Sequence, residues 1–248
     1  MRKGAIETDS LISVSNVFKN YKGRKALEGV SFEVFGGEVL GIIGPNGAGK
    51  TTLISLLATI NKPETGKISI KGADILKKPD IIRESLGYVP QETALYPMLT
   101  AYENLDFWGG IYGIEKSVKK EKINEVLKLL KLYDRKNDKV KTFSGGMKKR
   151  LNIAASLLHD PEILIMDEPT AGVDLLSRST IAELIKRLKK SGHTTIITSH
   201  YIDELEELCD KILVLWEGSL LYFGSVKDIL RSASADNLEQ LMLKLEEA

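Results

Sequence analysis

The feature that most constrains this chain is a glycine-rich segment, Gly44–Thr51, which fits the pattern G-x-x-x-x-G-K-[ST] at every fixed position. It follows the apolar run Val39–Ile43, which is typical of a buried strand, and it leads into the helix-like run Lys50–Ile60. In this arrangement the backbone N–H groups of the turn and the positive end of the helix point at the same anion. The segment therefore predicts a nucleotide-binding site.

Within this loop, Lys50 is expected to reach the β- and γ-phosphates, and Thr51 is expected to offer its hydroxyl to Mg²⁺. The other loop positions expected to bind the nucleotide are Gly44, Asn46, Gly47, Ala48, Gly49 and Thr52.

Two carboxylates end another apolar run, Ile163–Met166. The carboxyl end of a buried parallel strand lies at the sheet edge where a phosphate loop also lies. We therefore expect Asp167 to hold Mg²⁺, directly or through water, and Glu168 to act as the general base toward the attacking water. Two acids before Pro169 could by themselves be simple turn residues, but the phosphate loop favours the catalytic interpretation.

Hydrophobic patterning predicts the fold class. Alternation with period 2 in the first seventy residues, as in Val30–Val34, is typical of half-exposed antiparallel strands. Continuous apolar blocks favour a central sheet that helices cover on both faces; these blocks are residues 39–43, 163–166, 195–197 and 212–215. Residues 100–158 show no convincing strand. We predict an α/β fold: a P-loop NTPase with a mostly parallel central sheet, an N-terminal antiparallel β subdomain and an α-helical subdomain.

The expected organisation is a single nucleotide-binding domain over residues 1–248, because no linker rich in Gly, Ser or Pro divides it. Residues of about 1–91 and 160–230 are expected to form the core with its antiparallel subdomain, and residues of about 92–159 the helical subdomain. A single C-terminal helix is expected over about 231–248.

Composition excludes several classes of protein. The 35 Lys and Arg nearly balance the 34 Asp and Glu, so no strong positive field attracts a phosphate backbone, and no nucleic-acid partner is expected. The longest apolar run, Ile212–Trp216, is far shorter than the roughly 20 residues of a membrane span. The first ten residues contain no apolar stretch, so we expect no secretory signal and an intracellular, soluble chain.

A second helix start precedes the carboxylate strand. Ser144 is a natural N-cap, and Met147–Leu158 has a helical pattern. This helix end could also bind phosphate, which would be redundant within one nucleotide site. It becomes useful if each subunit offers Ser144, Gly145 and Gly146 to the nucleotide held by a partner in a two-fold dimer.

With these motifs in this order, the chain resembles the nucleotide-binding subunit of an ATP-binding cassette (ABC) transporter over nearly its whole length. The resemblance implies ATP and Mg²⁺ as ligands, and it makes Ser144–Gly146 the signature motif. Four further residues match the family's motifs. Tyr21 corresponds to the aromatic residue on which adenine stacks, and Gln91 corresponds to the Q-loop residue near the metal and water. Asp174 corresponds to the D-loop residue at the dimer seam, and His200 corresponds to the switch histidine at the γ-phosphate.

The resemblance implies an ATPase subunit that dimerises on ATP binding, with itself or a homologue, and energises an integral membrane subunit from the cytoplasmic face. Phe143 and Met147 differ from the commonest residues at these positions of the signature motif. Both residues occur in the drug-exporter-like branch of the family, and this resemblance favours export over import. A soluble ABC-type ATPase that acts on DNA or the ribosome is an alternative, supported only by the basic residues 116–141. A small-molecule kinase would leave Ser144, Asp174 and His200 without a purpose.

Overall fold

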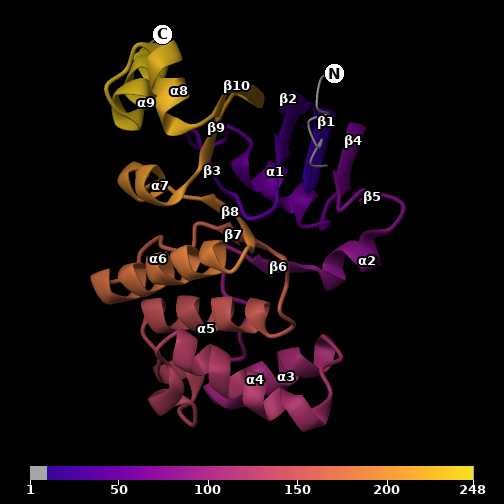
Figure 1. Cartoon of the computed structure of the whole chain (residues 1–248), viewed down its shortest axis with the longest axis vertical. Coiled ribbons are helices and arrows are strands. Elements are labelled where there is room, and N and C mark those ends of the chain that lie inside the picture. Colours follow the sequence, from indigo (N-terminus) through magenta and orange to yellow (C-terminus); the bar gives the residue numbers. More distant parts are fainter. Residues whose placement is uncertain (1–9, 248) are drawn as a thin grey trace, which may run out of the picture.

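The computed structural model describes residues 10–247, so most of the segment that carries our expectation of no secretory signal lies outside the described residues. A six-stranded sheet forms the centre of the molecule, in the order β10-β9-β3-β8-β7-β6 (Figure 1). All neighbouring strands are parallel except β9 and β10. The strands are β3 (Val39–Ile43), β6 (Leu86–Val89), β7 (Ile163–Asp167), β8 (Thr194–Thr198), β9 (Lys211–Trp216) and β10 (Ser219–Gly224).

The continuous apolar blocks are explained by burial on both faces of this sheet. In β7, Ile163 and Ile165 enter one hydrophobic core, whereas Leu164 and Met166 enter the other. Successive side chains of a strand point to opposite faces, so a strand covered on both sides must be apolar at every position. Polar side chains can therefore be placed only at the ends of such a strand.

One face of the central sheet is covered by α1 (Lys50–Leu57) and by a four-stranded antiparallel sheet in the order β2-β1-β4-β5. Ile12 of β1 pairs with Val34 of β2 and with Ile70 of β4, and all three side chains are buried. The bounds are β1 (Ile12–Tyr21), β2 (Arg24–Val34), β4 (Thr65–Ile70) and β5 (Ala73–Asp74), and the short helix α2 (Pro79–Glu84) follows.

Helices cover the other face. In Figure 1, α6 lies against the sheet, α5 lies below it, and α3 and α4 form the outer layer. The helices are α3 (Ala101–Ile111), α4 (Lys116–Leu129), α5 (Gly145–Leu157), α6 (Leu175–Lys190) and α7 (Ile202–Leu208). The predicted antiparallel sheet, mostly parallel sheet and helical segment are therefore confirmed, while the domain boundaries stay predictions.

The C-terminal segment differs from the single helix expected over about 231–248. It contains two helices, α8 (Val226–Ala233) and α9 (Leu238–Glu247). Ser234 ends α8 in the left-handed conformation, with φ 51°. This reversal folds α9 back against α7 and α8, so that Leu238 and Leu241 are buried. Among residues 10–247, no helix is both long and apolar enough to cross a membrane.

Asn104 ties the helical segment to the loop that follows β6. Its side chain is fully buried at the start of α3. The amide oxygen accepts from the N–H of Tyr96 at 2.7 Å, and the amide nitrogen donates to the carbonyls of Tyr96 at 3.1 Å and Thr100 at 2.9 Å. One buried side chain thus pairs three backbone groups of the preceding segment.

We predict that Asn104→Ala lowers the free energy of unfolding by about 2–4 kcal/mol, because it removes three hydrogen bonds, each worth about 1 kcal/mol, and leaves the N–H of Tyr96 without its partner. Urea denaturation followed by circular dichroism measures the change. Lys120→Ala, on the exposed face of α4, is the control and should change the stability by less than about 0.5 kcal/mol. Equal stability of the two variants would contradict the assignment.

Candidate active site at the carboxyl edge of the parallel sheet

The phosphate loop lies between β3 and α1, as predicted. Gly44 and Gly49 have φ values of 153° and 106°, in the region that only glycine adopts readily. A Cβ at Gly44 would lie 2.2 Å from the carbonyl oxygen of Leu215, and one at Gly49 would lie 2.4 Å from that of Ala26. No side chain caps the start of α1, which leaves its positive end for a ligand.

A cavity of about 430 Å³ opens beside this loop. It brings together residues from the β1–β2 turn, the loop, the segment after β6 and the end of β7. Its lining consists of Tyr21, Arg24, Ala26, Asn46, Gly47, Gly49, Lys50, Thr51, Thr52, Gln91 and Glu168. Of the predicted loop residues, Gly44 and Ala48 do not line it, and the Ala48 side chain is buried.

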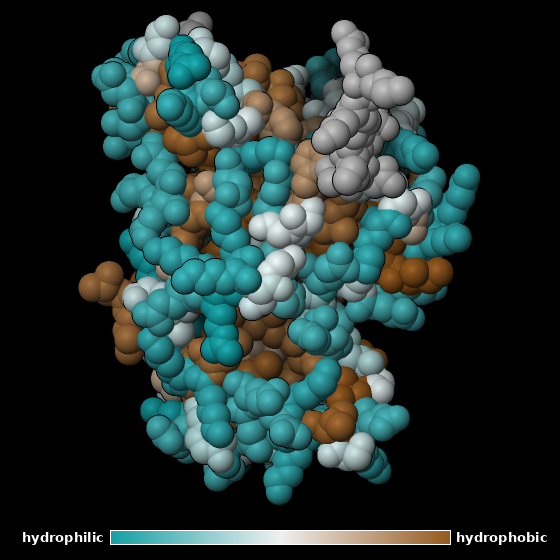
Figure 2. Space-filling view, in the orientation of Figure 1, coloured by the Kyte–Doolittle hydropathy of each residue, from teal (hydrophilic) through white to brown (hydrophobic). Residues whose placement is uncertain are grey.

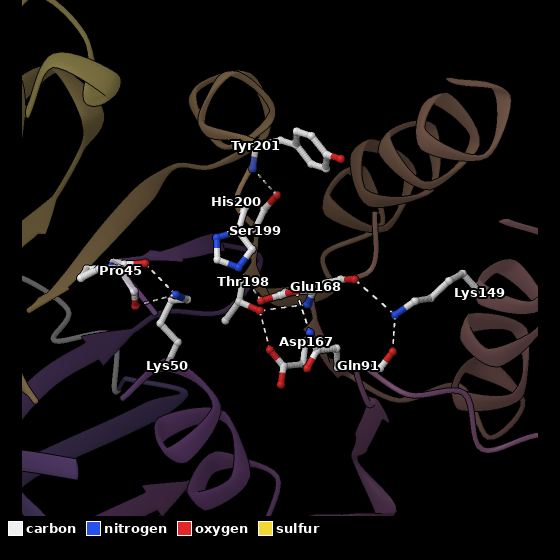
Figure 3. Close-up of polar contacts among 11 residues, drawn as sticks. Pro45, Lys50, Gln91, Lys149, Asp167, Glu168, Thr198, Ser199, His200 and Tyr201 are labelled. Carbon is white, nitrogen blue, oxygen red and sulfur yellow. Dashed lines mark hydrogen bonds and ion pairs between the residues drawn. The ribbon is translucent and has the colours of Figure 1, made fainter. Parts of the chain in front are cut away.

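Lys50 is buried and folds back onto its own loop. Its Nζ donates to the carbonyl of Gly44 at 2.6 Å and to that of Pro45 at 3.1 Å (Figure 3). Burial lowers the pKa of Lys50, and the nearby carboxylates of Glu168 and Asp167 oppose this shift. To reach a phosphate, the ammonium group must exchange these carbonyls for the phosphate oxygens.

Asp167 and Glu168 are joined through one hydroxyl group. Asp167 ends β7 opposite Thr198, the last residue of β8. The Thr198 Oγ1 donates to the buried Asp167 carboxylate at 2.6 Å and accepts from the Glu168 N–H at 2.9 Å. Glu168 itself has φ 48°, a conformation that is uncommon for a residue with a side chain. The chain therefore turns sharply between the two carboxylates.

The Glu168 carboxylate is held between two residues that follow the strands on either side of β7, Gln91 after β6 and His200 after β8. Gln91 Nε2 donates to one oxygen at 2.8 Å, and His200 Nε2 lies 2.8 Å from the other (Figure 3). The buried Lys149 of α5 donates to the backbone carbonyls of Gln91 and Glu168. Desolvation lowers the pKa of Lys149, against the effect of the Glu168 and Asp167 carboxylates.

The helix end at Ser144 lies outside this cluster. Ser144 caps α5, since its Oγ accepts from the N–H of Met147 at 3.2 Å, and Asp174 caps α6 in the same way through Ser177. These bonds to Ser177 lower the pKa of Asp174. A Cβ at Gly146 would lie 2.5 Å from Asp174 Oδ2, so the starts of α5 and α6 are in contact. Neither Ser144, Gly145, Gly146 nor Asp174 lines the cavity.

Sequence reasoning missed three residues of this region. Thr198 follows the apolar block at residues 195–197 and was given no role, although its place at the strand end opposite Asp167 becomes visible once β7 and β8 are paired. Lys149 carried no local signal. Arg24 lines the cavity, and its Nη2 lies 2.6 Å from where a Cβ of Gly47 would be. Nothing in the sequence places this guanidinium beside the phosphate loop.

Comparison with known proteins identifies the family. A family model described as "ABC transporter" matches residues 27–171 of this chain. The linearmycin resistance ATP-binding protein LnrL of Bacillus subtilis is 44% identical over 93% of this chain and 74% of its own length. The chain belongs to the ABC transporter family. The doxorubicin resistance ATP-binding protein DrrA of Mycobacterium tuberculosis is 36% identical over 91% of the chain and 69% of its own length.

Solved structures of ABC proteins agree with this family. An ATP-binding subunit of an ABC transporter superposes with a TM-score of 0.87 at 30% identity, over 96% of this chain and 100% of that one. A dimeric post-hydrolysis state of an ATP-binding cassette, bound to ADP and Pi, gives a TM-score of 0.80 at 28% identity, over 86% and 98% of the two chains. The prediction of an ATP-binding, ATP-hydrolysing subunit of an ABC transporter is therefore confirmed.

We predict that Thr198→Val lowers the turnover of ATP by roughly 10- to 100-fold, because it removes two hydrogen bonds that orient Asp167 and Glu168, each worth about 1–1.5 kcal/mol. Thr198→Ser keeps the hydroxyl and should retain most of the activity. Phosphate release by the two purified variants measures the difference, and thermal melting confirms that both are folded. A valine variant as active as the serine variant would refute the role of this hydroxyl.

Proposed function

We propose that ATP hydrolysis takes place at a site built from two chains, with the cavity of one and the Ser144 helix end of the other. One observation carries the proposal: the described chain has two helix ends suited to phosphate, and they do not meet within one copy. The start of α1 lines the cavity, whereas the start of α5 lies against Asp174 and outside it. A second chain related by a two-fold axis supplies the missing side.

In this proposal Glu168 is the general base. Its carboxylate takes a proton from the water that attacks the γ-phosphate, and Gln91 and His200 hold it in place through the 2.8 Å contacts. Thr198 fixes the backbone N–H of Glu168 and so the direction of its side chain. His200, which is 46% exposed, stands where it can also contact the γ-phosphate.

The oxygen atoms at this edge of the sheet suit Mg²⁺. Carboxylate, hydroxyl and amide oxygens are the ligands that this ion prefers. Residues 10–247 contain no group of three or more His, Cys, Asp or Glu that could hold a metal alone. Mg²⁺ is commonly bound by one or two carboxylates together with waters and substrate phosphates. We assign Asp167, Thr51 and Gln91 to this role. When bound, Mg²⁺ neutralises charge on the β- and γ-phosphate oxygens.

The nucleotide itself is bound by the cavity wall. Tyr21 is 44% exposed and offers a ring face on which adenine stacks. The phosphates lie on the backbone N–H groups of the loop and on Lys50, which leaves the carbonyls of Gly44 and Pro45 to reach them. The proposed loop contacts are Gly44, Asn46, Gly47, Ala48, Gly49 and Thr52.

The partner chain completes the site through Ser144, Gly145 and Gly146, with Asp174 at the seam. The γ-phosphate then bridges two chains, so ATP binding favours the closed dimer. Hydrolysis removes that bridge and allows the dimer to open. A cycle of closing and opening is the mechanical output that a membrane subunit can use.

We assign this output to export, with the subunit at the cytoplasmic face of a separate membrane subunit. The support comes from relatives named for resistance to linearmycin and doxorubicin and from one named for Nod factor export, which is 38% identical over 86% of this chain. The residues Phe143 and Met147 of the signature segment agree with the drug-exporter-like branch of the family.

We predict that Glu168→Gln lowers ATP turnover by at least about 100-fold while ATP still binds, because the amide keeps the shape of the side chain but cannot accept the proton. Phosphate release and equilibrium nucleotide binding are measured on the purified protein. Glu162→Gln makes the same chemical change at an exposed position before β7 and should leave turnover unchanged. Normal turnover in Glu168→Gln would refute the general-base assignment.

A further inference from the structure

A lysine of α5 is buried between the two segments that carry Gln91 and Glu168. Lys149, the fifth residue of this helix, is only 9% exposed, in a molecule whose charged side chains otherwise cover much of the surface (Figure 2). Its ammonium group donates to the backbone carbonyl of Gln91 and, at 3.3 Å, to that of Glu168 (Figure 3). Lys149 therefore links the backbones of two residues whose side chains are themselves paired at 2.8 Å.

The ammonium group is held by carbonyl groups, while the Glu168 carboxylate bonds to Gln91 and His200 instead. Burial lowers the pKa of Lys149, and this desolvation is a cost that an apolar side chain of similar length would avoid. A buried charge that donates to two carbonyl groups fixes their directions, which an apolar side chain cannot do. The contacts of Lys149 thus indicate that it orients these two segments.

The backbone of Glu168 is the part of the site that most needs such support. Its φ of 48° is strained for a residue with a side chain. The Thr198 hydroxyl accepts from its N–H, and Lys149 donates to its carbonyl, so side chains from β8 and α5 hold both backbone groups. Without Lys149, one of the two groups that fix the direction of the Glu168 carboxylate is free to turn.

The helix that carries Lys149 begins at Ser144. Lys149 lies five residues after this N-cap, which is about 7.5 Å along the axis at 1.5 Å per residue. Because the hydrogen-bonded backbone of a helix is stiff over so short a distance, a displacement of the start of α5 also displaces Lys149. The carbonyls of Gln91 and Glu168 are bonded to Lys149 and follow it.

We propose that Lys149 is a positioning residue for ATP hydrolysis, which aligns Glu168 and Gln91 with the helix whose start engages the nucleotide of a second copy. The inference rests on the proposed function, which makes Glu168 the general base and Ser144 the contact with that nucleotide. When α5 is seated on the nucleotide of the second copy, Lys149 holds the general base in line with the attacking water. Hydrolysis in one chain then depends on the nucleotide bound by the other.

The test replaces Lys149 by methionine, which keeps the length of the side chain and removes its charge and its donors. We expect Lys149→Met to lower the turnover of ATP roughly 10- to 100-fold, while the equilibrium affinity for ATP changes less than about twofold. The ATP-bound dimer should last longer than that of the unmodified protein, because it opens only after hydrolysis; light scattering after addition of ATP follows its decay. Lys120→Met makes the same change on the exposed face of α4 and should match the unmodified protein in all three measurements.

A purely structural role of Lys149 would have the opposite effect on the dimer. If Lys149→Met binds ATP more weakly and its dimer is weaker or shorter-lived, the lysine only supports the fold and the inference is wrong. Lys149→Arg keeps the charge and the N–H donors, and it should turn over ATP at least about fivefold faster than Lys149→Met. Equal rates in the two folded variants would also overturn the inference.

The variant Glu168→Gln separates failure of the inference from failure of the proposed function. If Glu168→Gln slows turnover and prolongs the ATP-bound dimer, whereas Lys149→Met behaves like Lys120→Met, the inference alone is wrong. If Glu168→Gln leaves both turnover and the dimer unchanged, the proposed function is wrong and the inference with it.

Discussion

The site depends on the parallel register of four strands that end at one edge of the central sheet. The phosphate loop follows β3, and Gln91 comes shortly after β6. Asp167 ends β7 with Glu168 directly after it, and Thr198 ends β8. Because both faces of these strands are buried, polar groups can gather only where the strands stop. The pairing of Asp167 with Thr198 fixes the positions of these polar groups, because one hydroxyl group then orients two consecutive carboxylate residues.

The helical layer carries Ser144, which we propose completes the nucleotide site of a second copy. The start of α5 is capped by Ser144 and packed against Asp174, so its position is set by α6 and not by the cavity. In the proposed function this arrangement favours association, because the chain binds a nucleotide on one side and would present a second helix end to the phosphate held by another copy. In the proposed cycle, turnover of the nucleotide is coupled to the approach and separation of two chains, a motion that a membrane subunit could use.

The sequence predicted those parts of the structure that depend on local pattern. Alternating and continuous apolar runs distinguished the antiparallel sheet from the central one, and the motif Gly44–Thr51 gave the phosphate loop with its strand and helix. The short strands β6 and β10 were missed, because four to six residues of mixed character carry little periodic signal. The C-terminal helix predicted over about 231–248 is present as α9 but begins at Leu238, and the preceding α8 and the turn at Ser234 were not predicted.

The site residues also fall into two groups, those that a local motif predicts and those that only the folded chain brings into place. Glu168, Gln91 and His200 carry recognisable motifs, and they meet in the structure. Thr198 donates to Asp167, which is 31 positions away in the chain, and the Arg24 guanidinium lies beside Gly47, which is 23 positions away. No local pattern encodes such contacts. The present contacts of Lys50 with its own loop were also unexpected, because the motif describes the ligand-bound role of that side chain.

The most direct test of a site shared by two chains is the ATPase activity of a mixture of two inactive variants, Lys50→Ala and Ser144→Arg. In a mixed dimer both changes fall in one site, and the other site combines an intact phosphate loop with an intact Ser144 helix end. If the variants associate at random, equal amounts should recover about a quarter of the activity of the unmodified protein, since half the dimers are mixed and each has one of two sites. No activity above the sum of the separate variants would contradict the account.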